Sequence, residues 1–153
     1  MSSRIGSGYD SHRFAAGRRL VLGGVEIGHE QGLEGHSDAD VLAHAVTDAI
    51  LGAGGLGDIG THFPPTDARW RDANSIELLR TAVAMVSGWV VNVDATVICE
   101  QPHLAEHREA MQRNLTEAVG APVNVKATTN EGMGWVGRGE GIACVAVALV
   151  EVG

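Results

Sequence analysis

The longest apolar run in the chain extends from Ile142 to Val150 and is rich in valine and alanine. A run this short cannot cross a bilayer, which takes about 20 apolar residues in a helix, and its β-branched composition is typical of a buried strand. A buried strand needs a sheet around it and further elements that cover it. Because 44% of the 153 residues are apolar, the chain has enough material for one such core. We therefore expect a single domain that spans residues 1–153.

The remaining segments predict an α+β domain. A first strand over residues 4–14 is interrupted by Gly6 and Gly8, as a bulged or substrate-facing strand is, and a turn at 15–18 would allow a hairpin with residues 20–27. Further strands are expected over 89–100, 122–127 and 141–152, and helices over 75–86 and 105–119. This order predicts one mostly four-stranded sheet with helices packed on one face and a small hairpin.

The clearest helix covers residues 41–51, where an apolar stripe recurs at helical spacing. Ser37 and Asp40 have the spacing of a capping box before this helix, and Gly52 follows it as a C-terminal glycine. Asp40, His44 and Asp48 recur every four residues and form a polar row beside the apolar stripe. A polar row beside a core face indicates a site.

A metal site is predicted by the first strand and this helix together. Asp10 and His12 are two positions apart, so both side chains point to the same face of a strand. Together with His44 they form a ligand set that a catalytic zinc ion can use, with the fourth tetrahedral position left for substrate or water. Asp48 either orients His44 or is a solvated helix residue.

The charge of the chain argues against polyanionic partners. Eleven Lys and Arg against nineteen Asp and Glu give a net charge of −8, the wrong sign for binding nucleic acid or an anionic membrane. An anionic substrate would be held by arginines, backbone amides, helix ends or metal ions, since Lys126 is the only lysine. Cys99 and Cys144 form no disulfide or zinc-finger pattern. With no signal-peptide pattern at the N-terminus, we expect a cytoplasmic protein.

A second group of polar residues follows the strand at 122–127. Thr128 and Thr129 lead into a glycine-containing loop that carries Glu131. Hydroxyls and backbone amides bind phosphate, and a single carboxylate with water and phosphate oxygens is a common way to hold Mg²⁺. The spacing of a Walker loop is absent. This segment is therefore a candidate phosphate and magnesium site.

Six motifs, taken in this order, resemble the 2-C-methyl-D-erythritol 2,4-cyclodiphosphate synthase family. They are GYDSHRF at 8–14, HSDAD at 36–40, the helix at 44–51, LGDIG at 56–60, NVKATT at 124–129 and GRGEGIA at 137–143. The resemblance implies that 4-diphosphocytidyl-2-C-methyl-D-erythritol 2-phosphate is cyclised to the 2,4-cyclodiphosphate with release of CMP, in the non-mevalonate route to isoprenoids. The enzyme class it implies is a metal-dependent phosphorus–oxygen lyase.

The resemblance also implies roles for individual residues. Zn²⁺ would bind to Asp10, His12 and His44, Mg²⁺ or Mn²⁺ would bind through Glu131, and His36 and Thr129 would stabilise the transition state. The substrate contacts it implies are Ser37, Asp58, Ile59, Gly60, Phe63, Asp67, Cys99, Glu100, Pro102, His103, Leu104, Ala105, Thr128, Trp135 and Arg138. The implied assembly is a homotrimer with active sites between subunits.

The chain departs from the usual family pattern at a few positions outside the zinc triplet. His103 stands in place of a common lysine, Ala39 in place of a glycine, Pro65 in place of an aspartate and Asn130 in place of a threonine. Read from the residues alone, two other functions fit: a zinc hydrolase, which lacks an obvious general base, and a trimeric binding protein with a structural metal. The open fourth position argues against the second, because structural zinc is normally closed by four protein ligands.

Overall fold

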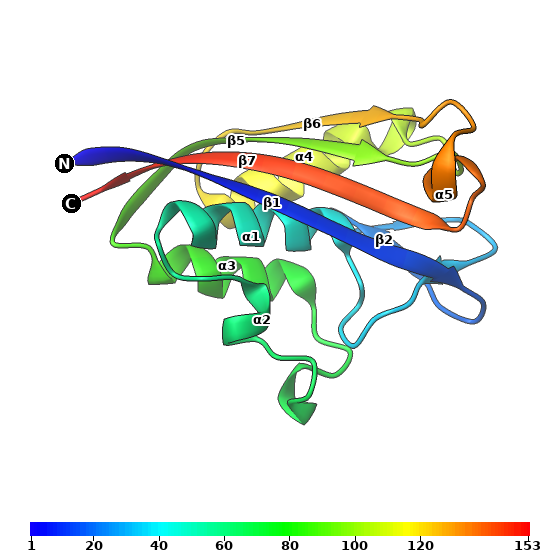
Figure 1. The fold of residues 1–153 in the computed structure, drawn as a ribbon, viewed down its shortest axis with the longest axis horizontal. Helices are drawn as coiled ribbons and strands as arrows, with labels where there is room; N and C mark the ends of the chain where they lie inside the picture. The colour runs from blue at the N-terminus through cyan, green and yellow to red at the C-terminus, as the bar shows by residue number, and fades with distance from the viewer.

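A computed structural model describes all residues from Met1 to Gly153 as an α+β domain built on a five-stranded sheet (Figure 1). The strand order is β4-β1-β7-β5-β6. The β1–β7 and β5–β7 pairs are antiparallel, whereas β5 and β6 run parallel. The strands are β1 (Ser2–Ala15), β4 (Gly32–Leu33), β5 (Gly88–Ile98), β6 (Val123–Thr128) and β7 (Gly141–Val152).

Three helices lie on one side of this sheet: α1 (Val41–Ala53) and α4 (Arg108–Val119) pack on its strands, and α3 (Ser75–Met85) packs against α1 and α4 (Figure 1). The short helices α2 (Ile59–His62) and α5 (Gly134–Gly137) and the 3₁₀ turns η1 (Ala68–Trp70) and η2 (Ala105–His107) lie in the connections. No helix is both long and apolar enough to span a membrane.

The predicted α+β class and the helix-covered face are confirmed, but the strand count and the hairpin differ from the prediction. Residues 20–27 do not pair with β1. They divide at Gly23 and Gly24 into β2 (Leu20–Leu22) and β3 (Val25–Ile27), which pair with each other. Both glycines have positive φ (55° and 71°), which a tight hairpin turn requires. The fifth strand of the sheet is the two-residue β4, too short to leave a pattern in the sequence.

Gly6 and Gly8 allow β1 to lie directly on α1. A Cβ atom at Gly6 would lie 2.1 Å from the carbonyl oxygen of Ala49, and one at Gly8 would lie 2.0 Å from that of Ala45. Neither glycine marks a bulge, because the β1–β7 register continues without a shift. The glycines therefore set how closely β1 approaches α1, and this contact brings the strand's inward side chains to the helix.

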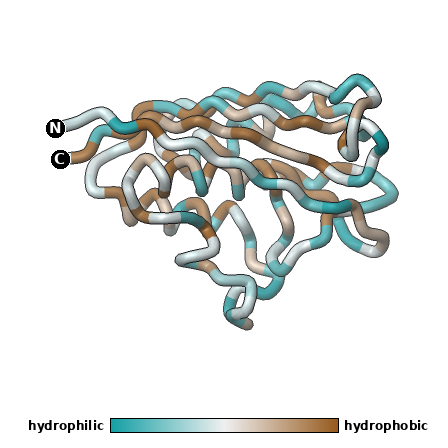
Figure 2. Tube along the Cα trace, in the orientation of Figure 1, coloured by the Kyte–Doolittle hydropathy of each residue, from teal (hydrophilic) through white to brown (hydrophobic).

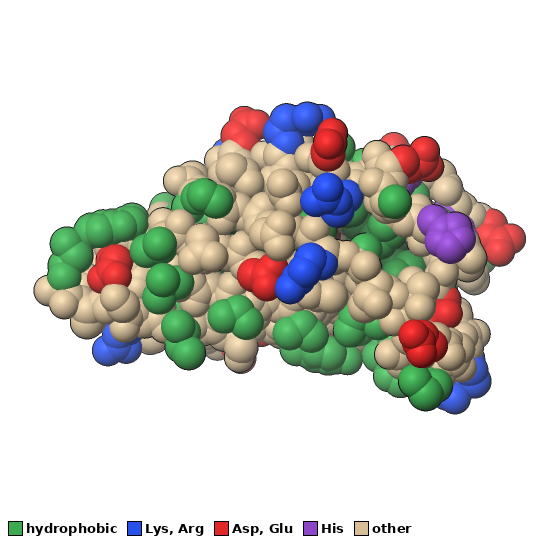
Figure 3. Space-filling view, turned by 90° about the horizontal axis from the view of Figure 1, so that it is seen from above, with side chains coloured by type: hydrophobic (Ala, Val, Ile, Leu, Met, Phe, Trp, Pro, Cys, Tyr) green, Lys and Arg blue, Asp and Glu red, His purple; other side chains and the backbone are tan.

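Strand β7 is buried on one face and exposed on the other. Its inward residues Cys144, Ala146 and Val150 are fully covered by the helices, and the apolar residues gather along this layer (Figure 2). Val145 and Val147 point to the opposite face and are 40% and 48% exposed. Figure 3 shows apolar side chains on the surface seen from this side of the molecule. The apolar run thus serves the core on only one face of the sheet.

Asp40 begins α1 and also ties the β2–β3 hairpin to it. Its carboxylate accepts hydrogen bonds from the backbone N–H groups of Ala43 (2.9 Å), Gly23 (2.9 Å) and Gly24 (2.8 Å). Asp40 is fully buried, so the first member of the polar row serves the helix start and the hairpin. The helix start therefore depends on Asp40, whereas the capping-box pattern had pointed to Ser37.

Candidate metal centre

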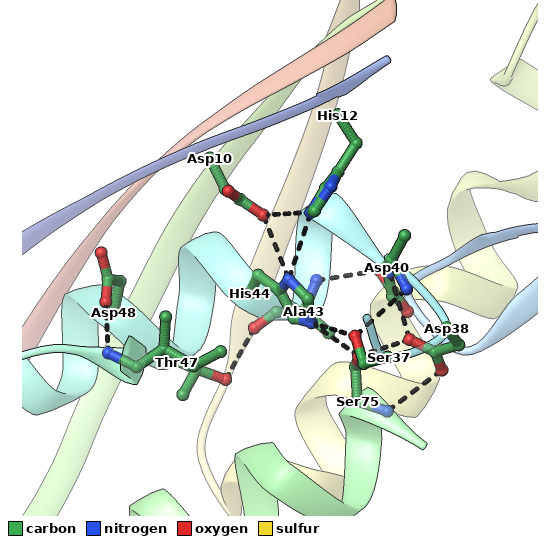
Figure 4. Close-up of polar contacts among 12 residues, drawn as sticks. Asp10, His12, Ser37, Asp38, Asp40, Ala43, His44, Thr47, Asp48 and Ser75 are labelled. Carbon is green, nitrogen blue, oxygen red and sulfur yellow. Dashed lines mark hydrogen bonds and ion pairs between the residues drawn. The ribbon is translucent and has the colours of Figure 1, made fainter. Parts of the chain in front are cut away.

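Asp10 and His12 on β1 and His44 on α1 bring three ligand atoms together (Figure 4). Oδ2 of Asp10 lies 2.8 Å from Nε2 of His12 and 3.1 Å from Nδ1 of His44, and the two nitrogens are 3.4 Å apart. Ligands of a tetrahedral zinc ion with bonds of about 2.0–2.1 Å are separated by about 3.3 Å. The triangle formed by these atoms is therefore close to this size, with its two edges at Asp10 somewhat shorter.

Hydrogen bonds to groups outside the triangle orient both imidazoles, so that each directs a nitrogen lone pair toward the other ligand atoms. Nδ1 of His12 donates to the carbonyl oxygen of Glu34 at 2.8 Å, which leaves Nε2 as the acceptor. Nε2 of His44 lies 2.7 Å from the hydroxyl of Ser75, and that hydroxyl donates to the carboxylate of Asp38. Nε2 of His44 is then the protonated nitrogen, and Nδ1 carries the lone pair.

The electrostatics of the triangle also favour a cation. Burial raises the pKa of the Asp10 carboxyl, but hydrogen bonds and attraction to His12 and His44 outweigh it and lower this pKa to about 2. Burial lowers the pKa of His12, yet its bond to Asp10 outweighs that effect and raises the pKa above its ordinary value. Three electron-rich atoms at these distances need a positive charge among them, which a proton on His12 supplies in the metal-free protein and which a bound cation would replace. The donor set thus fits a divalent cation with a position left open.

A cavity of about 150 Å³ opens beside the two histidines of the triangle. Five of the predicted substrate and catalytic residues line it together with His12 and His44: His36, Ser37, Ile59, Gly60 and Phe63. Pro65, Trp70 and Leu78 complete the wall, and Trp70 and Leu78 were not predicted. The indole N–H of Trp70 is buried and has no acceptor in the chain. The cavity therefore joins polar groups near the triangle to an apolar wall.

The loop between α1 and α3 holds the cavity residues in place. His36 Nε2 donates to the carbonyl oxygen of Asp67 at 3.0 Å, whereas the carboxylate of Asp67 pairs with Arg69 at 2.6 Å. The carboxylate of Asp58 accepts from the backbone and hydroxyl of Thr61 and begins α2. Both carboxylates thus lie outside the lining of this cavity.

Asp48 acts on the loop and not on His44. Its Oδ1 accepts a hydrogen bond from the backbone N–H of Ile59 at 2.8 Å. The hydrogen-bond partners of His44 Nε2 are the hydroxyls of Ser37 (3.1 Å) and Ser75 (2.7 Å). Asp48 therefore fixes the start of α2, and the orientation of His44 comes from the two serines.

A second cavity, of about 260 Å³, collects another set of predicted residues. Its lining includes Cys99, Pro102, His103, Leu104, Ala105, Thr128 and Thr129, and also Arg108, which was not predicted. Burial raises the pKa of the Cys99 thiol to about 12, and Sγ donates to the carbonyl oxygen of Gln101. The two cavities share no residue. The predicted site residues that line them therefore belong to two separate cavities of one chain.

Four further predicted residues lie outside both cavities. The Glu100 carboxylate accepts from the backbone N–H of Asn130, Arg138 pairs with Glu140 at 2.9 Å, and Trp135 is 36% exposed. Glu131 is exposed and adopts a φ of 52° in the loop after β6. A single carboxylate of this kind suits a magnesium ion whose other ligands are water and phosphate.

A family model for the YgbB family matches residues 3–151. The chain belongs to the YgbB family. It is 62% identical to 2-C-methyl-D-erythritol 2,4-cyclodiphosphate synthase of Rubrobacter xylanophilus, over 97% of this chain and 94% of the relative. It is 58% identical to the Bordetella petrii protein of the same name, over 96% of this chain and 94% of that relative.

Two solved structures have the same fold as this chain. The bifunctional IspDF from Campylobacter jejuni superimposes with a TM-score of 0.93 at 42% identity, over 99% of this chain and 43% of that one. A CDP-bound form of 2C-methyl-D-erythritol-2,4-cyclodiphosphate synthase gives a TM-score of 0.88 at 37% identity, over 97% of this chain and all of that one.

Ser75 and Asp38 support His44 of the triangle, and the sequence did not predict this role for them. The sequence predicts Ser75 only as the first residue of the helix over 75–86, and the structure caps this helix with Asn74. Asp38 lies in a motif whose spacing says nothing about position 75. The contact between them forms because α3 packs against α1, and no periodicity within either segment reports it.

Proposed function

We propose that this chain is a 2-C-methyl-D-erythritol 2,4-cyclodiphosphate synthase, a single domain over residues 1–153 that acts in the non-mevalonate isoprenoid pathway. The observation that carries the proposal is the triangle of Asp10, His12 and His44, beside a cavity lined by His36 and Ser37. The named relatives at 62% and 58% identity support the same function. Its reaction converts 4-diphosphocytidyl-2-C-methyl-D-erythritol 2-phosphate to the cyclic diphosphate and CMP.

The nucleophile of this reaction belongs to the substrate. An oxygen of the 2-phosphate bonds to the β-phosphorus, and the bond from that phosphorus to the α–β bridging oxygen breaks, so that CMP leaves. The protein therefore contributes positioning and charge neutralisation. Zn²⁺ on the triangle and Mg²⁺ or Mn²⁺ on Glu131 would supply the positive charge that an acidic chain lacks near its diphosphate.

Ser37 and Thr129 are the proposed hydroxyl donors to phosphate oxygens, and the imidazole of His36 is placed beside the same phosphates. The imidazole of His36 is held by the carbonyl of Asp67, and Ser37 is buried beside His44. Groups fixed in this way stabilise developing charge without rearranging during the reaction. We assign transition-state stabilisation to His36 and Thr129, and phosphate binding to Ser37.

The methylerythritol unit is assigned to the α2 region of the first cavity. Ile59, Gly60 and Phe63 line this region, and Asp58 and Asp67, whose carboxylates lie outside the cavity lining, would bind hydroxyls that extend beyond it. Asp48 supports this assignment, because its bond to the N–H of Ile59 fixes the backbone there. The cytidine is assigned to the second cavity, with Thr128, Trp135, Arg138 and residues 99–105 around it.

A homotrimer would unite the two cavities, each active site taking one from each of two neighbouring subunits. The uncovered face of the sheet supports self-association, since Ile5, Tyr9 and Val147 are 76%, 56% and 48% exposed on it. Apolar surface of this kind on a sheet marks an interface. A cytoplasmic location remains a prediction, consistent with two free, buried cysteines.

Phosphorus NMR tests the proposed function directly. The purified protein would be incubated with the cytidyl substrate and Mg²⁺, before and after removal of zinc with a chelator. Cyclic diphosphate and CMP that appear only with zinc would support the synthase. Linear hydrolysis products would favour a zinc hydrolase, and unchanged substrate would contradict the proposal. His44→Ala is expected to abolish zinc binding and turnover in a folded protein.

A further inference from the structure

A third cavity, of about 480 Å³, lies next to His36. Its lining includes Arg18, His36, Arg71 and Asp72. Since His36 also lines the cavity beside His44, the two cavities share this side chain as a common wall. Two of the chain's eleven cationic residues thus meet next to the candidate metal centre of a chain with a net charge of −8.

Neither arginine is neutralised by the protein. The arginines that form ion pairs are Arg19, Arg69, Arg80 and Arg138. Asp72 is the only carboxylate in the lining, and neither Arg18 nor Arg71 pairs with it. By contrast, Arg69, two residues before Arg71, forms an ion pair with Asp67 at 2.6 Å.

Arg18 is also fixed in position. One Nη atom donates to the carbonyl oxygen of Ser37 at 2.7 Å, and Ser37 in turn contacts His44. A guanidinium has five N–H donors in a planar fork, so the remaining donors of Arg18 are available to a ligand. Forked donors of this kind suit phosphate, which accepts two hydrogen bonds from one arginine.

We infer that Arg18 and Arg71 form an anion subsite beside His36 that holds the attacking 2-phosphate of the substrate. This inference rests on the proposed function, in which the two metal ions serve the α- and β-phosphates and the third phosphate has no cationic side chain assigned to it. Two guanidinium groups beside His36 would reduce the repulsion between that phosphate and the diphosphate, and would hold it next to the β-phosphorus.

The existence of the subsite is tested with inorganic phosphate and zinc-free protein. The arginine Nε–Hε signals of Arg18 and Arg71 are expected to shift saturably in ¹H–¹⁵N NMR spectra. Arg113, exposed on α4, is the matched control for non-specific attraction. The inference would be overturned if the two signals did not shift, or shifted no more than that of Arg113. It would also be overturned if replacing one arginine with alanine left the shift of the other unchanged, because the two would then not share one anion.

Kinetics test whether the subsite serves the substrate. Arg71→Ala and Arg18→Ala are expected to raise KM for the cytidyl substrate at least tenfold, with CDP binding unchanged because CDP lacks the 2-phosphate. Arg71→Lys should recover part of the loss, and Arg113→Ala should match the wild type. KM and kcat within twofold of wild type in both alanine variants would refute the role. If the wild type forms no product, the proposed function fails, and the NMR titration alone decides whether an anion subsite exists.

Discussion

Replacing Ser75 with alanine removes the hydroxyl that links His44 to Asp38. Ser75 is fully buried, its Oγ lies 2.7 Å from His44 Nε2, and it donates to the Asp38 carboxylate. The variant leaves a buried N–H and a carboxylate oxygen without this partner, at a cost of about 1–3 kcal/mol. When Nε2 of His44 carries the hydrogen, Nδ1 has the lone pair that binds the metal. Losing the acceptor of the Nε2 hydrogen makes this tautomer less favourable, so part of the cost appears as weaker zinc affinity.

The expected loss of zinc affinity for Ser75→Ala is about tenfold, the lower end of the range for residues that orient a metal ligand. We expect a loss at the lower end of this range because the hydroxyl of Ser37, 3.1 Å from the same Nε2, can accept the hydrogen bond in place of Ser75. Replacing both serines removes both acceptors, and we expect a loss of about 100-fold.

Zinc dissociation constants, measured by competition with a chromophoric chelator, check this expectation. Thr47→Val is the matched control: Thr47 is buried one turn from His44, but its hydroxyl donates to the Ala43 carbonyl and does not touch the triangle. The control should lose stability and keep its zinc affinity. A folded Ser75→Ala protein whose zinc affinity stays within twofold of wild type would refute the reasoning.

Four further predictions concern the triangle, the loop and the sheet. The rise in Tm caused by zinc should increase from about pH 6 to about pH 8, because zinc binds only the unprotonated ring of His12. The raised pKa of His12 stabilises the metal-free protein at pH values below the pKa of this residue in the unfolded chain, and this stabilisation is lost as the pH rises through its pKa in the folded protein. A flat or falling difference would contradict this. Asp48→Ala should raise KM about fivefold with zinc affinity unchanged, because the lost bond goes to Ile59 and is worth about 1 kcal/mol; weakened zinc binding would show that Asp48 acts on His44 after all. Gly8→Ala should lower the free energy of unfolding by about 1–3 kcal/mol and weaken zinc binding, whereas Gly28→Ala, whose Cβ meets nothing within 4 Å, should do neither; equal denaturation midpoints for the two variants would disprove the close-approach argument. Val147→Glu should dissociate the proposed trimer, as seen by light scattering, and an unchanged mass would remove this face from the interface.

Local patterns were sufficient for the elements that hold the metal ligands. Asp10 and His12 share a strand face, and His44 lies on a helix whose apolar stripe is plain in the sequence. Their convergence was inferred from ligand chemistry, and the family resemblance made that inference firm. What could not be predicted is the outer support, because the Ser75 hydroxyl reaches His44 only through the packing of α3 on α1.

Other differences arise where one local signal has two meanings. Gly6 and Gly8 suggested a bulge, but glycine also permits close backbone approach, and only the tertiary contact with α1 distinguishes the two. The Gly23–Gly24 pair is a hairpin signal in its own right, and a single strand over residues 20–27 overlooked it. The exposed valines of β7 look like core residues in the sequence, since periodicity does not reveal whether a partner covers a face.

The pairing of β1 with β7 has a consequence for how this domain can be joined to other polypeptides. Ser2 lies opposite Val152, so both chain ends leave the sheet side by side, as Figure 1 shows. Asp10 and His12 lie further along the same ladder, toward its other end at Arg13 and Gly141. A tag, tether or second folded unit can therefore be attached at either end, or the two ends linked to each other, while the residues of the metal centre keep their surroundings.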